Sequence, residues 1–377
     1  MTNKSLLDLE QTSPKADPEE LLRRLEAYIR DNPAQAASFP ERPEEPISQD
    51  CCGQSCTPCV FDLYRSDLYQ WARDCAVQAE ILPTEVVAEK LSACENEHIS
   101  PMSSREYRRF KLVEIEPISA DTNLYRFQLP SSSMKLNIPI GSHLILRGRN
   151  KKGKLVTRPY TPITDPSVIG HFDVMAKVYK YGEMSHHWKG LSVDDECEWK
   201  GPFGSFLYET NKYQRILMLA AGTGIAPMAQ VINAVLGNEQ DDTQLRLIFC
   251  SRNFDDILLR DKLAEWSRHW NFKVKHVLSK EECVDSKRYG EDILSCGERL
   301  SQPVLAAELD EFLQCHPVGC QDDQGGKAAD ASSFISEEAA ASAVLICGTK
   351  SFDKDVINFI KKTTGESSEI LKNCFRF

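Results

Sequence analysis

The pattern of hydrophobic and polar positions changes twice along the chain, near residues 105 and 211. Between these two points, short stretches rich in β-branched and aromatic residues, such as 109–115 and 143–146, are separated by turn residues. Strands at this spacing predict an antiparallel barrel. Beyond residue 211, apolar runs such as 216–221 alternate with helical patterns, which predicts an α/β domain with a parallel, doubly wound sheet.

The chain before the barrel has a different composition. Residues 1–42 are charged and contain prolines, which predicts a flexible leader with one amphipathic helix at 19–30. Residues 43–76 form a small cysteine-rich module that ends in an aromatic run suited to a short amphipathic helix. Residues 77–102 are predicted as a second helix and a linker.

The barrel domain is therefore placed at 103–210 and the sheet domain at 211–377. Within the latter, residues 316–341 are rich in Gly, Ala, Ser and Asp, which predicts a surface insertion. A chain of 377 residues is long enough for such a multidomain arrangement.

Charge and composition exclude some classes of function. A formal net charge of -11 argues against a nucleic-acid-binding protein. The chain contains no apolar run long enough to cross a bilayer, and its first residues resemble neither a signal nor a transit peptide. A soluble intracellular protein is expected, with the cytoplasm favoured over the mitochondrion.

Fourteen cysteines without a secretory signal suggest reduced thiols or metal ligands rather than disulfides. Four of them are grouped in one short segment: Cys51, Cys52, Cys56 and Cys59. Thiolates this close suit zinc or an iron–sulfur centre, although the spacing is not that of a standard zinc finger. A packed, reduced cluster or a partner-docking element is an equally weighted alternative. The segment around them resembles the short oxidoreductase-like domain.

The first motif with chemical content is Arg158-Pro159-Tyr160-Thr161-Pro162, at the end of a predicted barrel strand. Arginine offers a permanent planar charge for a diphosphate, tyrosine a ring to pack on a flat cofactor, and threonine a short hydroxyl. Alternation along a strand places Arg158 and Tyr160 on one face. These groups suit a flavin dinucleotide.

Three further elements follow in order: Lys177-Val178-Tyr179, the turn Gly182-Glu183-Met184-Ser185, and Gly201-Pro202-Phe203-Gly204. A helix that starts after Gly182 would bind phosphate through its backbone N–H groups. Together the elements resemble the flavin domain of the cytochrome b5 reductase family. The resemblance implies FAD contacts from Arg158, Pro159, Tyr160, Thr161, Gly182, Met184 and Ser185, and implies that Lys177 and Val178 line the flavin ring or the nicotinamide approach.

The second motif is Gly222-Thr223-Gly224-Ile225-Ala226-Pro227, directly after an apolar strand. Glycines at a strand end allow close backbone approach, and proline suits the first turn of the next helix. A nucleotide is expected at this edge of a parallel sheet, bound by Gly222, Thr223, Gly224 and Pro227.

The same resemblance covers the rest of the chain, from about residue 105 to 377. It implies that Cys347, at a strand end, sets the nicotinamide against the flavin and that Phe377 lies near the site. Thr161, Lys177 and Cys347 are thus the expected catalytic residues. The chain departs from the family at Thr349-Lys350-Ser351, where prolines are usual, and at Ala226, where a hydroxyl is usual.

The predicted protein is a flavoenzyme that takes electrons from NADH, passes them through FAD, and gives them to a one-electron acceptor such as the haem protein cytochrome b5. Ser279 and Lys280 stand where many NADH-preferring relatives have an acidic residue, so NADPH is a second expected donor. Two alternatives stay open: a non-catalytic scaffold whose cysteine module binds metal or a partner, and an enzyme of the ferredoxin reductase or flavohaem type.

Overall fold

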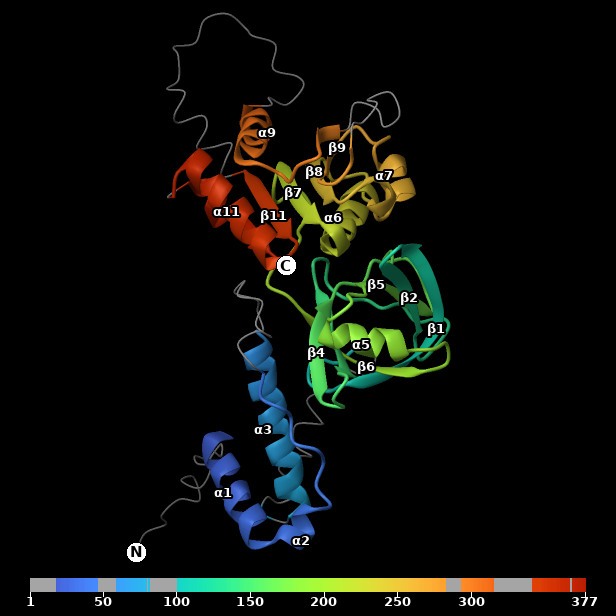
Figure 1. Cartoon of the computed structure of the whole chain (residues 1–377), viewed down its shortest axis with the longest axis vertical. Coiled ribbons are helices and arrows are strands. Elements are labelled where there is room, and N and C mark those ends of the chain that lie inside the picture. Colours follow the sequence, from blue (N-terminus) through green and yellow to red (C-terminus); the bar gives the residue numbers. More distant parts are fainter. Residues whose placement is uncertain are drawn as a thin grey trace, which may run out of the picture. The chain divides into compact units, whose positions relative to one another are not determined.

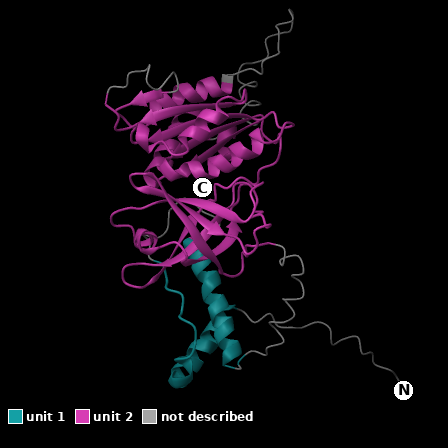
Figure 2. Ribbon diagram, turned by 90° about the vertical axis from the view of Figure 1, so that its right-hand side faces the viewer, with its two compact units in different colours: residues 1–51, 60–98 teal, residues 52–59, 99–377 magenta. Residues whose placement is uncertain are grey.

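A computed structural model describes most of the chain, namely residues 18–46, 59–79, 81, 100–282, 293–314, 341–366 and 368–377. The chain divides into two compact units, shown in separate colours in Figure 2. The first comprises residues 1–51 and 60–98, and the second comprises residues 52–59 and 99–377.

The first unit is helical. It contains α1 (Pro18–Asp31), α2 (Pro33–Ala36) and α3 (Val60–Gln78), drawn in blue in Figure 1. Leu25 of α1 is fully buried in a cluster with Leu68 and Trp71 of α3, and the Trp71 indole donates a hydrogen bond to the Pro40 carbonyl at 2.8 Å. Burying this apolar stripe of α1 is what favours the helix pair over an extended chain.

The helix predicted at 19–30 is confirmed. The flexible leader predicted at 1–42 is wrong for its described part, because α1 and the segment after it pack on α3. The short helix predicted from the aromatic run is confirmed and extends to Gln78. The second helix expected within 77–102 lies mostly outside the described residues.

The second unit begins with an antiparallel domain. Its strands are β1 (Arg108–Ser119), β2 (Thr122–Gln128), β3 (His143–Arg149), β4 (Leu155–Tyr160), β5 (His171–Lys177) and β6 (Glu196–Phe203), in the order β4-β3-β6-β1-β2-β5. The two outer strands approach each other through an antiparallel bridge between Pro162 and Val174, so the sheet curls towards closure. Its interior is aromatic: the rings of Phe127, Phe172 and Trp199 lie 5.2–5.7 Å apart. Helix α5 (Glu183–Gly190) packs against β3 and β4.

A parallel domain follows. Its strands are β7 (Arg215–Ala221), β8 (Gln244–Ser251), β9 (Phe272–Leu278), β10 (Ile293–Cys296), β11 (Ser342–Cys347) and β12 (Cys374–Arg376), in the order β10-β9-β8-β7-β11-β12. Every pairing in this sheet is parallel. The helical segments are η3 (Gly222–Gly224), α6 (Ile225–Leu236), η4 (Phe254–Asp256), α7 (Arg260–Trp266), α9 (Gln302–Gln314), α11 (Lys350–Thr364) and α12 (Glu369–Lys372).

Helices cover both faces of this sheet, as Figure 1 shows. Alternate residues of β7 explain the arrangement: Met218 is buried with α6 and α7, whereas Leu217 and Leu219 are buried with α9 and α11. A strand buried on both faces has to be apolar throughout, which is why 216–221 is an unbroken apolar run. Of the predicted antiparallel barrel followed by a doubly wound parallel sheet, the structure shows an antiparallel six-stranded sheet, and the parallel sheet is confirmed. The N-terminal module is helical where it is described.

Candidate functional site

The motif at 158–162 lies at the end of β4. Register with β3 places Arg158 opposite Leu146 and Tyr160 opposite Leu144. The Trp188 indole on α5 donates a 2.6 Å hydrogen bond to the Tyr160 hydroxyl, and the two rings meet edge to face at 5.2 Å. Burial raises the pKa of Tyr160 well above its usual value. The hydroxyl therefore stays neutral, and Tyr160 is fixed between the strand and the helix.

The turn before α5 has the form of an anion-binding helix start. Gly182 precedes the helix without a side-chain cap, and the Ser185 hydroxyl accepts a hydrogen bond from the Tyr179 N–H at 2.9 Å. A Cβ at Gly182 would lie only 2.6 Å from the Ser185 hydroxyl oxygen, so glycine keeps this approach open. First-turn N–H groups have no intrahelical carbonyl partner, which makes such a start suitable for phosphate.

Lys177, at the end of β5, is held in an ion-pair chain that joins the two domains of the second unit. Its ammonium lies 3.1 Å from Asp121, and the other oxygen of Asp121 lies 2.9 Å from Arg252 at the end of β8. Asp256 binds Arg252 through two hydrogen bonds of 2.6 and 2.7 Å. Asp121 and Arg252 were not predicted, because their segments are far apart in sequence.

The glycine turn after β7 packs directly on the end of β11. A Cβ at Gly224 would lie 2.1 Å from the Cys347 carbonyl oxygen, and Gly222 has a φ of +56°. Cys347 is half-buried, and burial together with the nearby Asp353 carboxyl raises the pKa of its thiol to about 12. Cys347 is therefore an uncharged thiol at neutral pH.

The last residues add aromatic side chains at this edge of the sheet. β12 pairs with β11, and the Phe377 N–H donates to the Ile346 carbonyl at 3.0 Å. The rings of Phe377 and Phe206 lie 5.7 Å apart. Phe377 thus lies beside the strand that ends in Cys347.

The two predicted groups of site residues meet where the antiparallel and parallel domains touch. Met175 of β5 is buried in the same cluster as Ile225 and Ala226 of α6, and η3 lies against β5. The structure therefore brings the glycine turn of the parallel domain next to the strand that ends in Lys177.

Comparison with known protein families identifies these domains. Residues 109–208 match the oxidoreductase FAD-binding domain, residues 218–300 the oxidoreductase NAD-binding domain, and residues 35–80 the N-terminal domain of oxidoreductase-like proteins. A mouse protein named NADH-cytochrome b5 reductase-like is 39% identical over 240 residues, which are 64% of this chain and 74% of the mouse protein. Its human counterpart is 37% identical over 251 residues, or 67% and 77% of the two chains.

The chain belongs to the NADH-cytochrome b5 reductase family. It is an FAD- and NAD-dependent oxidoreductase of that family, which favours the enzyme over the scaffold alternative. The fold agrees with a solved structure, the cytochrome b5 reductase domain of Ulva prolifera nitrate reductase. That structure has a TM-score of 0.58 and 24% identity, and the match covers 74% of this chain and all of that one.

The two departures from the reductase family pattern have structural explanations. Thr349 is the N-cap of α11, and its hydroxyl accepts the Phe352 N–H at 3.4 Å, so the helix starts without the usual prolines. Ala226 is buried in the first turn of α6, where a small apolar side chain fits.

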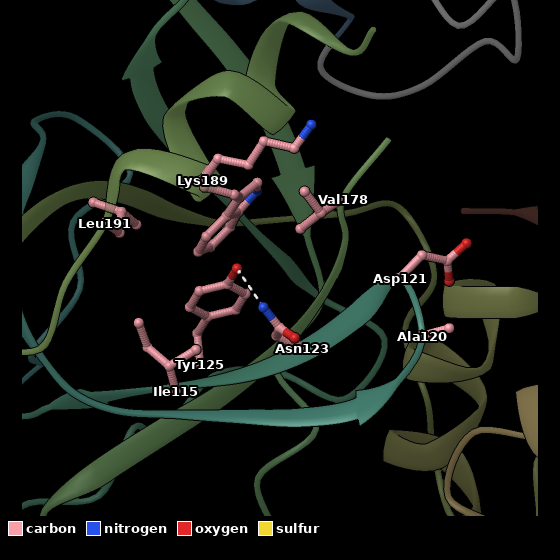
Figure 3. Close-up of a pocket in the computed structure, with 9 residues that line it drawn as sticks. Ile115, Ala120, Asp121, Asn123, Tyr125, Val178, Lys189 and Leu191 are labelled. Atoms are coloured by element: carbon pink, nitrogen blue, oxygen red, sulfur yellow. Dashed lines mark hydrogen bonds between the residues drawn. The ribbon is translucent and has the colours of Figure 1, made fainter. Parts of the chain in front are cut away.

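A pocket of about 400 Å³ lies beside the reductase flavin motif, between the β1–β2 hairpin and α5 (Figure 3). Val178, one of the predicted site residues, lines it together with Trp188 and Tyr125, whose rings are 4.2 Å apart. Asn123 donates to the Tyr125 hydroxyl at 3.2 Å, the dashed line in Figure 3. Sequence reasoning missed Trp188 and Tyr125, since a tryptophan inside a short helix resembles any core residue.

The structure describes only one of the four grouped cysteines of this reductase. Cys51, Cys52 and Cys56 lie outside the described residues, and Cys59 is half-buried just before α3. In the part of the chain that the structure describes, no cluster of three or more His, Cys, Asp or Glu side chains suits a metal ion. The metal site stays a prediction.

Among the helices that the structure describes, none is both long enough and apolar enough to span a bilayer.

Proposed function

We propose that this reductase passes electrons from NADH, through FAD, to a one-electron haem acceptor such as cytochrome b5. The observation that carries the proposal is the position of the glycine turn Gly222–Gly224 against β5, which brings residues expected at the nicotinamide next to residues expected at the flavin. The names of the mouse and human relatives support the choice of acceptor.

The residues around Gly182 fit the diphosphate of FAD. Arg158 supplies a permanent positive charge from β4, and the first turn of α5 supplies N–H groups. Met184 and Ser185 are buried at this turn, and the missing Cβ of Gly182 leaves the backbone accessible. Pro159 keeps β4 extended between Arg158 and Tyr160.

Uncharged side chains would surround the reacting rings. Tyr160 is a neutral phenol and Cys347 a neutral thiol, because burial raises the pKa of both. When bound, FAD accepts a hydride and releases electrons one at a time. Thr161 would place a hydroxyl beside the ring and Phe377 would offer an aromatic face, while the ion pair with Asp121 fixes Lys177.

The test is anaerobic reduction of the full chain loaded with FAD. NADH should bleach the yellow protein, and the reduced protein should then reduce cytochrome b5, as followed by the haem absorbance. Protein that cannot be loaded with FAD, or that NADH does not bleach, would overturn the proposal. Reduction of a ferredoxin but not of cytochrome b5 would overturn the acceptor alone.

Arg158→Gln tests the flavin site itself. Loss of one charge-assisted contact to phosphate should weaken FAD retention by about tenfold or more. Arg149→Gln, a change to an exposed arginine at the end of β3, is the matched control and should retain FAD as the parent does. Equal FAD affinity in the parent and in Arg158→Gln would remove Arg158 from the site.

NADPH is a second candidate donor. Ser279 and Lys280 follow β9, and their N–H groups donate to the carbonyls of Ser251 and Arg252 at 3.0 and 2.6 Å. Ser279 carries no carboxylate that would repel the 2′-phosphate of NADPH. The backbone of Arg252 lies next to the 279–280 segment. Comparable kcat/KM for NADPH and NADH would support this choice, and a strong preference for NADH would refute it.

A further inference from the structure

Gln230 is a buried amide of α6 that binds the other domain. Its side-chain oxygen accepts the Gly141 N–H at 2.8 Å, and its side-chain nitrogen donates to the carbonyls of Pro162 at 2.8 Å and Ser142 at 3.3 Å. The residue is 6% exposed. Every one of these partners belongs to the antiparallel domain, although Gln230 belongs to the parallel one.

The positions of these partners matter. Pro162 directly follows Thr161 at the end of β4, and Gly141 and Ser142 lead into β3, the strand that pairs with β4. The N-terminal end of α6 follows directly after the Gly222–Gly224 turn. Gln230 is six residues beyond Gly224, or about 9 Å along the helix. One rigid helix therefore connects the expected nicotinamide turn to the expected flavin strand.

Another polar link between the domains, at Arg252, cannot fix this distance as closely. The Arg252–Asp121 pair is partly exposed, and such ion pairs contribute little and hold their geometry loosely. Gln230 is buried, so losing its amide would leave the buried groups that it binds without a hydrogen-bond partner, which is far costlier than losing an exposed pair.

We propose that Gln230 is a positioning residue that sets the spacing between the nicotinamide site at Gly222–Gly224 and the flavin site at Thr161. This inference rests on the proposed hydride transfer from NADH to FAD. A displacement of about 1 Å between reacting groups is enough to slow such a transfer by about 100-fold.

Gln230→Met removes the amide but keeps a long side chain of similar size. Flavin content should stay unchanged and the NADH concentration for half-maximal reduction should shift less than about threefold, whereas the limiting rate of anaerobic flavin reduction should fall by about tenfold or more. Asn271→Leu is the matched control: Asn271 is also a buried amide, but it donates to the Thr243 carbonyl inside the parallel domain, at 3.2 Å. This variant should lose stability without losing the limiting rate.

Hydrogen exchange of the FAD-free protein gives a readout independent of turnover. The Gly141 amide should lose protection in Gln230→Met and keep it in Asn271→Leu. If the methionine variant does not fold, Gln230→Glu can replace it at a pH high enough to ionise the carboxyl, since one carboxylate oxygen then still accepts from Gly141 while the donor to Pro162 is lost.

A methionine variant that reduces its flavin as fast as the parent would overturn the role of Gln230, and so would an equal slowing in the Asn271 control. A parent protein that binds FAD but is not reduced by NADH would instead overturn the proposed function, and the two failures are therefore distinguishable.

Discussion

At the scale of single residues, Gly222 and Gly224 serve different needs. Gly222 has a φ of +56° with open space around it, so Gly222→Ala should cost only about 1–2 kcal/mol of backbone strain. Gly224 has an ordinary φ, but an added methyl would meet the Cys347 carbonyl at 2.1 Å.

Gly224→Ala should therefore move the end of β11, lower stability by about 1–3 kcal/mol, and slow flavin reduction more than Gly222→Ala does. Chemical unfolding and anaerobic reduction of both variants check this. If Gly224→Ala reduces its flavin at the parental rate, the close packing of the turn on Cys347 is unimportant for the reaction.

Asp353 should make stability depend on pH. Burial raises the pKa of this carboxyl to about 7, against an unperturbed 3.8, although the charge of Arg376 opposes the rise. The folded protein therefore holds a proton that the unfolded chain releases, and this contribution to stability is present below about pH 4 and disappears as pH rises to about 7.

Asp353→Asn should remove that dependence, so the variant should gain stability relative to the parent between pH 4 and 7, by at most about 4 kcal/mol. Urea unfolding at a series of pH values measures the difference. Asp355→Asn, at an exposed position, is the control, and its free energy of unfolding should depend on pH as that of the parent does. The prediction would be contradicted if the difference in the free energy of unfolding between Asp353→Asn and the parent did not change with pH.

The expected site residues that carry recognisable chemistry in a fixed order lie where the sequence placed them in the fold. Arg158, Tyr160 and the glycines of both turns are found at strand or helix ends as expected. Their partners could not be predicted in this way. Trp188 is 28 residues from Tyr160 in sequence, and Gln230 binds segments before β3 and after β4, so both contacts exist only once the sheets have formed.

At the scale of elements, α11 depends on its N-cap. The Thr349 hydroxyl accepts the Phe352 N–H, and α11 buries Val356 and Ile360 against the sheet. Thr349→Ala should lower the free energy of unfolding by about 1 kcal/mol, whereas Thr349→Ser should be nearly neutral because serine also caps. Chemical denaturation of both variants measures this, and equal losses would show that the hydroxyl does not act as a cap.

Element types were predictable where the hydrophobic period was clear. The apolar run 216–221 indicated a strand buried on both faces, and the alternation of strands and helices after it predicted the doubly wound sheet. Packing between helices was not predictable: the period of α1 predicted a helix, but nothing in 1–42 showed that Leu25 would be buried against Trp71 of α3.

At the scale of the whole molecule, the Lys177–Asp121–Arg252 chain should give the contact between domains a dependence on salt. Although burial opposes ionisation of Asp121, the hydrogen bond and charge of Lys177 and the charge of Arg252 keep its pKa below the usual value. Its stabilising contribution is therefore complete above pH 3.8 and is lost as pH falls through its lower, folded-state pKa.

Asp121→Asn should destabilise the protein at neutral pH by about 1 kcal/mol, and the difference should shrink at high salt. The control is Asp194→Asn, which breaks a surface pair with Lys111 within one domain and should have almost no effect. Thermal unfolding at low and high ionic strength checks both variants. An effect of Asp121→Asn that does not change with salt would argue against an ion pair.

The strand order of the parallel sheet also affects how the protein is made. β7 ends at Ala221, but its neighbour β11 begins only at Ser342, so on the ribosome one edge of β7 stays without its partner while more than a hundred further residues are translated. An unpaired, wholly apolar strand edge is prone to aggregate. Prematurely terminated chains that stop between β9 and β11 should therefore collect in the insoluble fraction and depend on chaperones more than the finished protein does.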